Sequence, residues 1–400
     1  MNIPAFDVLY SVSDLHIGGS PDFRIFDDAD ALASLIDEAA AHPAKRVVFV
    51  ANGDVLDFLA ATDADAYSTT KALRHLNEVL LPDLRLAPIF DALRRFTATP
   101  GRTLVVIVGN HDVEIAHPEV REALAARIQA PGSTIEWCTR QEGFRCMVGT
   151  HNVLCLHGNV TDAWNRVAPD YADSPTDAPN AGSLLVSRVL NKAKRRFRWL
   201  DVLKPEGLHL ALIALALDND TADPLLGPRE HTELVAISVR LAKDAAAGTF
   251  LTAAPAWELS SEGYLASQLG KFKYLLKRFL DAAQFSDPGH RDEQWKQLAR
   301  LHKADGTDIV IAGHTHAPRA GALTLGSASK GQYINTGTWA YVMTLTKQHF
   351  DVPEKFVELE RILRLPGNDG WNQLKDAGLL QPPRGYAFVD AAGAQLRRHR

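Results

Sequence analysis

Short apolar runs alternate with amphipathic stretches over the first 160 residues and return near the end of the chain. Continuous apolar runs of this length are typical of buried strands. Five of them stand out: Val8–Val12, Val47–Val50, Leu104–Val108, Val153–Leu156 and Ile309–Ala312. Ala29–Ala41, 118–129 and a broken stretch around 68–97 repeat apolar residues at helical spacing instead. This alternation predicts the α/β fold class, with strands and helices in layers.

Other stretches extend this pattern. Residues 144–148 and 152–157 predict a pair of strands joined by a turn that includes His151. We expect further strands at 332–335 and 356–363.

The pattern changes after the fourth apolar run. Pro, Asp, Ala and Ser dominate 168–182, which predicts a loop. Residues 183–303 are mostly helical in pattern, most clearly in Ser261–Gln284. The predicted segments are the first part of a catalytic domain (1–160), a helical cap insertion (161–304) and the second part of the catalytic domain (305–400).

The composition is that of an ordinary globular protein, with 46% apolar and 23% charged residues among 400. A formal net charge of −5 gives no overall positive field for nucleic acid. Three cysteines without metal-site spacing fit a reducing compartment. The first residues lack the basic and apolar segments of a secretory signal. Leu208–Leu217 is too short to span a bilayer, which takes ~20 residues. We therefore expect a cytoplasmic protein.

Each of the five apolar runs is followed by side chains that can bind a metal. In chain order these are Asp14, His16, Asp54, Asn110, His157, His314 and His316. The carboxyl ends of strands in a layered α/β fold gather the reactive groups, so residues from opposite ends of the chain can meet there. Carboxylates and imidazoles are ligands for Mn, Fe and Zn. The sequence therefore predicts a hydrolytic metal centre.

Spacing within these motifs favours two ions. Side chains two residues apart on an extended chain lie on the same face, which pairs Asp14 with His16 and His314 with His316. The two carboxylate oxygens of Asp54 allow it to bridge two ions, and neighbouring glycines allow close backbone approach. Two ions ~3.5–4 Å apart polarise a phosphoryl group and lower the pKa of a shared water, which then attacks as hydroxide.

In order and residue type, these motifs resemble the signature of the calcineurin-like metallophosphoesterases. They are Asp14-x-His16, Gly53-Asp54, Gly109-Asn110-His111-Asp112, His157 and Gly313-His314-x-His316. The resemblance covers 1–160 and 305–345 and implies a two-sheet β-sandwich flanked by helices, in four α/β/β/α layers. It says little about 161–304.

The resemblance also implies roles for individual residues. One divalent ion would take Asp14, His16, Asp54 and His316, and the other would take Asp54, Asn110, His157 and His314. His111 would be an acid that protonates the leaving oxygen, and Asp112 would hold its ring. The expected metal is manganese, with iron or zinc as alternatives. Asn52 and Asp57 flank Asp54, and we expect them to support the ligands.

Substrate identity is less constrained. Serine/threonine phosphatases of this superfamily carry Asp-Arg-Gly after the second motif, whereas this chain has no arginine in Gly53–Phe58. The first two motifs look more like the UDP-2,3-diacylglucosamine diphosphatases, which split a pyrophosphate on a lipid-linked nucleotide sugar, or the double-strand-break repair nucleases. The diphosphatase branch follows its fourth-motif histidine with Gly-Asp, and this chain has Gly158-Asn159. A nuclease, a cyclic-nucleotide phosphodiesterase and a non-catalytic metal-binding scaffold stay open as alternatives.

A basic segment at 188–204 offers one clue to the substrate. It carries seven Lys and Arg residues against the single acid Asp201, with leucine and aromatic positions between them. Such a helix can lie on an anionic membrane surface or grip substrate phosphates, and it can equally be a solvated face. Arg195, Arg196 and Arg198 are the candidate phosphate or lipid contacts. The insertion starts after His157 and ends before His314, so we expect it to cap the centre and to select the substrate.

Overall fold

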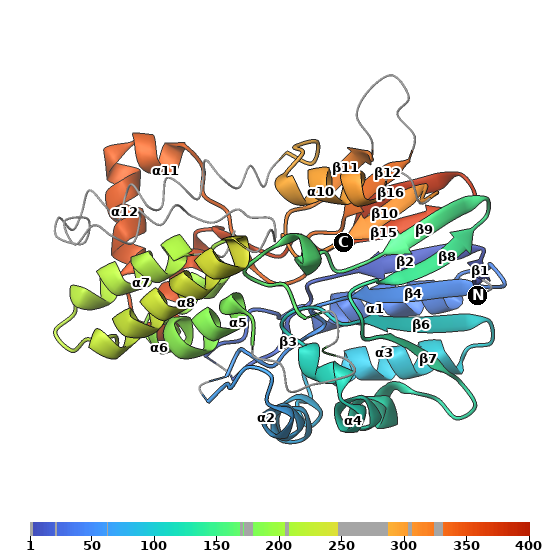
Figure 1. The fold of residues 1–400 in the computed structure, drawn as a ribbon, viewed down its shortest axis with the longest axis horizontal. Helices are drawn as coiled ribbons and strands as arrows, with labels where there is room; N and C mark the ends of the chain where they lie inside the picture. Colours follow the sequence, from blue (N-terminus) through green and yellow to red (C-terminus); the bar gives the residue numbers. More distant parts are fainter. Residues whose placement is uncertain are drawn as a thin grey trace.

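The computed structural model describes residues 3–20, 22–61, 63–168, 171, 179–204, 208–246, 287–302, 306–323 and 331–400. Two six-stranded sheets face each other in it (Figure 1). The first sheet has the order β16 (Gly393–Arg398), β15 (Gly385–Asp390), β2 (Val8–Val12), β4 (Val47–Asn52), β6 (Arg102–Ile107) and β7 (Ile135–Cys138). Its strands β2, β4, β6 and β7 are parallel, so their carboxyl ends share one edge.

The second sheet has the order β1 (Ala5–Phe6), β8 (Phe144–Val148), β9 (His151–Cys155), β10 (Ile309–Ala312), β12 (Gln332–Asn335) and β11 (Arg319–Ala322). Strands β9, β10 and β12 are parallel, which brings the fourth and fifth motifs to one edge although they are far apart in sequence. The predicted pairing of β8 with β9 is confirmed and is antiparallel. His151 begins β9 instead of lying in the turn, because it pairs with Val148.

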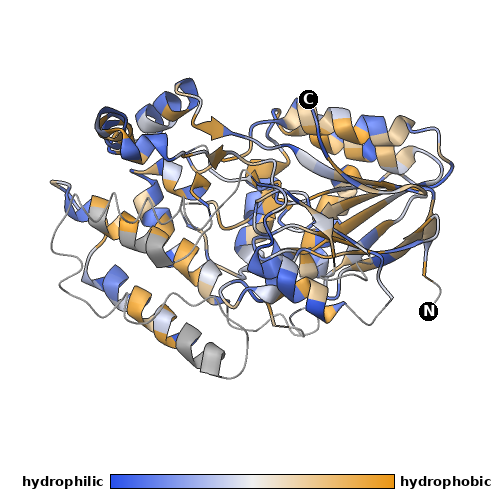
Figure 2. Cartoon of the chain, turned by 90° about the horizontal axis from the view of Figure 1, so that it is seen from above, coloured by the Kyte–Doolittle hydropathy of each residue, from blue (hydrophilic) through white to orange (hydrophobic). Residues whose placement is uncertain are grey.

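Continuous apolar strands form here because both faces of the first sheet are covered. In β4, Val48 and Val50 point into the core between the sheets. Val47 and Phe49 point the other way and pack with the helices. The covering helices are α1 (Ala29–Ala41), α3 (Ala87–Ala98) and α4 (Pro118–Ile128). In Figure 2 the strands are mainly hydrophobic, whereas the helices alternate hydrophobic and hydrophilic positions.

The outer face of the second sheet is covered by α10 (Glu293–Leu301), whose Trp295 stacks on Tyr333 of β12 with ring centroids 4.6 Å apart. This completes the expected two-sheet sandwich flanked by helices. Although α10 lies inside the predicted insertion, its core contacts are with the sheet.

A helical lobe lies beside the sandwich (Figures 1 and 2). Its first segment contains α5 (Ala181–Leu185), α6 (Asn191–Lys194), α7 (Leu208–Asn219) and α8 (Pro228–Ala246). Its second segment contains α11 (Gln348–Asp351), α12 (Pro353–Leu363) and α13 (Gly367–Asp376). One hydrophobic core joins the two, for example through Leu190, Leu215 and Leu363. The lobe is therefore built from the predicted insertion and from residues that follow the fifth motif.

The prediction of a strand at 356–363 is wrong, because these residues lie in α12. Phe356, Leu359 and Ile362 are buried at helical spacing, and Pro353 starts the helix in its first turn. The prediction for Ser261–Gln284 lies outside the described residues.

The region around 68–97 is helical and broken, as expected. It forms α2 (Thr69–His75), a π-helical turn η1 (Leu76–Leu80) and then α3. The remaining elements are β3 (Ile17–Gly18), β5 (Leu56–Asp57), β13 (Val342–Met343), β14 (Leu380–Gln381), η2 (Val113–Ala116), η3 (Asn159–Thr161), η4 (Val186–Leu190) and η5 (Arg198–Val202). Within the part of the chain that the structure describes, every helix is too short or too polar to cross a membrane.

Candidate metal centre

The structure brings the seven predicted ligands together at the carboxyl ends of β2, β4, β6, β9 and β10. Hydrogen bonds join the loops that carry them. The amide of Asp14 donates to the Gly53 carbonyl at 3.1 Å, and the amide of Gly313 donates to the His157 carbonyl at 2.9 Å. Asn52 links the two sheets at this edge, because its side-chain nitrogen donates to the carbonyl of Leu156 at 3.1 Å. Asn52 therefore supports the ligands, as expected.

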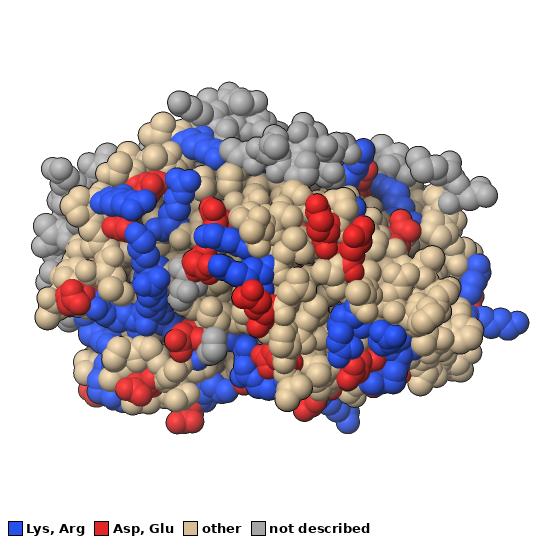
Figure 3. All heavy atoms as spheres, turned by 90° about the horizontal axis from the view of Figure 1, so that it is seen from below, with Lys and Arg blue, Asp and Glu red and all other residues tan. Residues whose placement is uncertain are grey.

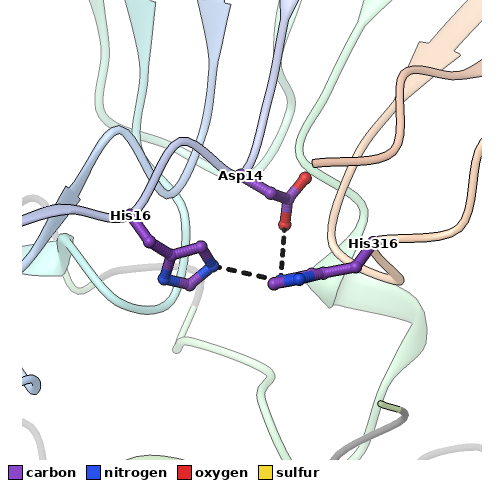
Figure 4. Close-up of side chains that lie close together, drawn as sticks. All are labelled: Asp14, His16 and His316. Carbon is purple, nitrogen blue, oxygen red and sulfur yellow. Dashed lines mark hydrogen bonds and ion pairs between the residues drawn. The ribbon is translucent and has the colours of Figure 1, made fainter. Parts of the chain in front are cut away.

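One group of ligands consists of Asp14, His16 and His316, whose ligand atoms all lie within 4.8 Å of one another. Figure 4 shows the two rings and the carboxylate pointing toward one point. Nε2 of His316 lies 3.0 Å from Nε2 of His16 and 3.3 Å from Oδ1 of Asp14. Two facing ring nitrogens beside a carboxylate form a donor set suited to a divalent transition metal.

A second group consists of Asp54, His157 and His314, again within 4.8 Å of one another. Nε2 of His157 lies 3.1 Å from Oδ2 of Asp54 and 3.2 Å from Oδ1 of Asn110. The same Asp54 oxygen is 3.9 Å from Nε2 of His16 in the first group. Asp54 therefore lies between the groups, where a bridging ligand is needed.

The backbone of the ligand loops is unusual. Among the described residues, seven non-glycine residues have positive φ, and five of them are predicted ligands: Asp14, His16, Asp54, His314 and His316. Residues other than glycine rarely adopt a positive φ, and each instance costs about 1–3 kcal/mol. Glycines make room for these loops: a side chain at Gly53 would meet the ring of His157, and one at Gly313 would meet Asp14. Strain concentrated on five ligands indicates that the fold holds these side chains for function.

Electrostatics at the centre favour a cation. Burial would raise the pKa of Asp54, but the charges of His157, His111 and His16 outweigh it and hold the pKa well below its ordinary value. Burial opposes a charge on His157, yet attraction to Asp54 raises its pKa to about 9. Nδ1 of His316 is a buried nitrogen without a hydrogen-bond partner among the described residues. Buried carboxylates and ring nitrogens thus meet at one place, and divalent ions would complement this donor set.

His111 lies beside the first group, with its ring packed edge-on to that of His16 at a centroid distance of 4.7 Å. Nδ1 of His111 contacts Oδ1 of Asp57 at 3.2 Å, and the other oxygen of Asp57 lies 2.9 Å from Nδ1 of His16. Asp57 thus holds a predicted ligand and the predicted acid with one carboxylate, and hydrogen bonds to both keep its pKa well below its ordinary value against the effect of burial.

Asp112 was predicted to hold the His111 ring, but its carboxylate contacts backbone amides instead. Its Oδ1 accepts from the amide of Gly109 at 2.7 Å, and its Oδ2 accepts from the amide of Val55 at 2.7 Å. These bonds tie the second-motif loop to the third-motif loop. The ring position that we expected Asp112 to hold is taken by Asp57, so the assignment of the orienting carboxylate is corrected.

The three candidate substrate arginines lie in the helical lobe. Arg196 pairs with the fully buried Asp218 at 3.2 Å. Arg198 stacks on the ring of Trp371 at 4.1 Å and donates to the Arg24 carbonyl. Arg195 is exposed at the end of α6. Arg196 and Arg198 hold the lobe together, and substrate contact by the three residues stays a prediction.

Two supporting residues were not predicted from the sequence with these roles. Asp162 contacts His314, with Oδ2 and Nε2 3.0 Å apart. Lys204, from the lobe, is only 6% exposed. Burial and then the charge of Lys204 lower the pKa of His316 well below its ordinary value, which shows that the lobe places a cation near the first ligand group. Asp162 belongs to no motif, and Lys204 is the last cation of the basic segment 188–204. Only the fold brings the two residues to the centre.

The turn that follows β12 supports the site. Asn335 donates to the Gly313 carbonyl at 2.7 Å, and the hydroxyl of Thr336 lies 2.6 Å from that of Ser13. Both contacts brace loops that carry predicted ligands.

Comparison with known proteins agrees with this geometry. A model of the family described as calcineurin-like phosphoesterase matches residues 9–234, from β2 into α8. A search of curated proteins found no match. The match covers more than half of the chain, and His314 and His316, which lie beyond it, complete the two ligand groups. The chain belongs to the calcineurin-like phosphoesterase family.

Proposed function

We propose that this protein is a metal-dependent phosphoric ester hydrolase that cleaves a phosphodiester or pyrophosphate bond. One observation carries the proposal: two groups of ligand atoms meet at Asp54, with His111 packed beside them. Two divalent ions bound there, manganese in our proposal, would polarise the phosphoryl group and lower the pKa of water, so that water attacks at neutral pH.

His111 acts as the acid in this proposal. Its Nδ1 faces Asp57, and Nε2 is the nitrogen that would donate a proton to the leaving oxygen. The negative charge of Asp57 favours the protonated ring and fixes its orientation. The same carboxylate orients Nδ1 of His16, which leaves Nε2 of that ring for a metal.

The helical lobe is the candidate for substrate selection. Lys204 lies in a segment that follows η5, and its charge acts on His316, so the lobe can contribute to binding an anionic group near the metals. The absence of an arginine after Asp54 disfavours a phosphoprotein, and a lipid-linked nucleotide sugar is our candidate substrate. Positive and negative side chains are interspersed on the face in Figure 3, which gives no support to a nucleic-acid track.

A substrate panel with added Mn²⁺ tests the proposal. It contains bis-p-nitrophenyl phosphate, a pyrophosphate-linked nucleotide-sugar lipid, cyclic nucleotides, single-stranded DNA and a simple monoester. We expect hydrolysis of the generic diester and the fastest turnover of the pyrophosphate lipid. Asp54→Ala protein from the same preparation excludes contaminating phosphatases. A protein that binds two Mn²⁺ ions but hydrolyses no member of the panel would be a scaffold.

A further inference from the structure

His314 is held differently from the other ring ligands. Nδ1 of His16 faces Asp57, and Nδ1 of His157 lies 3.1 Å from the Asn52 carbonyl. Both rings therefore present Nε2 to the centre. In His314 it is Nε2 that has a partner, the Asp162 carboxylate at 3.0 Å. Nδ1 is the nitrogen left to face the second group of ligands.

The Asp162 carboxylate is fixed by its own loop. Its Oδ1 accepts from the amide of Trp164 at 2.9 Å, and its Oδ2 accepts from the side chain of Asn165 at 2.8 Å. The amide of Asp162 donates to the Asn159 carbonyl at 3.0 Å, which fastens the loop to the residues directly after His157. A carboxylate that accepts from two donors of its own loop, on a backbone that the loop also fastens, is a rigid partner for an imidazole.

The same loop is fastened to the start of the helical lobe. The amide of Gly182, in the first turn of α5, donates to the Trp164 carbonyl at 2.7 Å. The side chain of Asn180 donates to the Asn165 carbonyl at 3.3 Å. A side chain at Gly182 would meet Oδ1 of Asn165, so the backbones need glycine to come this close. One short loop thus contacts a predicted ligand on one side and the lobe on the other.

We propose that Asp162 is a positioning residue for the second metal. It fixes His314 in the tautomer that offers Nδ1 to the ion, and it ties this ligand to the helical lobe. The proposal rests on the dinuclear centre of the proposed function. Loss of such a carboxylate partner typically weakens metal binding ~10–100-fold. The effect should fall on the second ion alone, since among the described residues the Asp162 carboxylate contacts His314 and its own loop but no member of the first ligand group.

The experiment measures Mn²⁺ binding by the full-length protein, Asp162→Asn and Asp162→Ala after removal of metal with a chelator. Calorimetry gives the affinity of each site, and electron paramagnetic resonance distinguishes a coupled Mn²⁺ pair from isolated ions. We expect Asp162→Ala to bind one ion with near-normal affinity and the second ~10–100-fold more weakly. Asp162→Asn should lie between Ala and wild type, because the amide oxygen still accepts from Nε2. Both variants should show less of the coupled-pair signal at limiting Mn²⁺.

Asp308→Asn is the matched control. The Asp308 carboxylate also accepts from a backbone amide, that of Asn152 in β9 at 2.9 Å, but it lies at the opposite end of β9 and β10. The Asp308→Asn protein should bind both ions with wild-type affinity. Equal weakening of both sites by Asp162→Ala, or no weakening, overturns the proposal. So does a Mn²⁺-bound crystal structure with an Asp162 oxygen coordinated to the metal. If the wild-type protein binds no pair of ions, the proposed function itself fails.

Discussion

The ligand edge of the sandwich and the helical lobe use buried charge in opposite ways. At the ligand edge, the carboxylates of Asp14, Asp54 and Asp57 lie close together and are almost fully buried. In the lobe, buried charges are paired: Lys194 lies 2.5 Å from Asp201, and Arg196 faces Asp218. The first arrangement gathers carboxylates and ring nitrogens where a cation would bind, whereas the second pairs its charges within the chain.

This difference indicates what each region contributes. Strained ligand loops lower stability, and a fold retains such strain when function requires it. Paired charges in a helical core hold packed segments in one arrangement, and loss of one partner leaves the other buried and unpaired. We therefore expect substitutions at the ligand edge to remove metal or activity without unfolding the protein. Substitutions of the lobe pairs should lower the free energy of unfolding and leave metal binding unchanged.

The largest effect should come from Asp54→Ala, which removes the only predicted ligand shared by both ions. Metal content, measured by plasma mass spectrometry, should fall by one or both ions. Loss of a residue that only supports a ligand typically weakens metal binding by up to ~100-fold. Loss of the Asp54 ligand should weaken metal binding more than this, and hydrolysis should fall to background. Retention of two ions would contradict the bridging role.

His111→Ala should reduce kcat ~10²–10⁴-fold with metal content near normal, because the predicted acid is not a ligand. The loss should be smaller for bis-p-nitrophenyl phosphate, whose leaving group needs no proton. Asp57→Asn is the companion variant: since Asp57 holds both His111 and His16, it should weaken metal binding as well as turnover. Equal damage to metal binding and turnover by His111→Ala would identify His111 as a ligand.

Much of the sandwich and of the ligand set was predictable from sequence. In each of the five motifs an apolar run is followed by metal-binding side chains, as expected at the carboxyl end of a strand, and parallel strands place those ends on one edge. Finer contacts were not predictable. Asp57 and Asp112 both lie near motif residues, and only the loop conformation decides that Asp57 meets the His111 ring while Asp112 turns to backbone amides.

The lobe was less predictable because its charges have no fixed spacing relative to their partners. The basic segment 188–204 reads as a binding surface, but Arg196 and Arg198 find partners in later helices. The second segment of the lobe, α11 to α13, has no signal that relates it to the first. Its packing depends on contacts between residues far apart in sequence, such as the indole of Trp199 with the Leu363 carbonyl at 2.8 Å.

Arg196→Ala tests the lobe side of the comparison. It leaves the fully buried Asp218 without its charged partner, and breaking a buried pair in this way costs about 3–5 kcal/mol. Urea unfolding should show this loss, while Mn²⁺ stoichiometry stays at the wild-type value. Arg361→Ala is the control, because its pair with Glu358 is exposed and should leave stability almost unchanged. If Arg196→Ala instead lost metal without losing stability, Arg196 would support the metal centre and would not stabilise the lobe.

The smallest effect concerns Glu114, a buried acid behind the third motif whose carboxylate accepts from the amide of Tyr67 at 2.9 Å. Burial, with a further contribution from Asp112, raises its pKa from 4.5 to about 8. The folded protein therefore keeps a proton on Glu114 that the unfolded chain releases above about pH 4.5. The stability from this protonated form is complete below that pH and is lost as pH rises to about 8.

Glu114→Gln is neutral at every pH and can still accept the Tyr67 amide. Its thermal midpoint should equal that of the wild type at pH 5 and exceed it at pH 8 by a few degrees, since about 1 kcal/mol shifts the midpoint by ~2–4 °C in domains of 150–250 residues. Some pH dependence should persist, because burial and Asp54 also raise the pKa of Asp112 to about 7. An equal shift at both pH values would mean that packing, rather than charge, causes it. A lower midpoint at pH 8 would show that the ionised carboxylate is favourable, and Glu114 would then belong with the paired charges of the lobe.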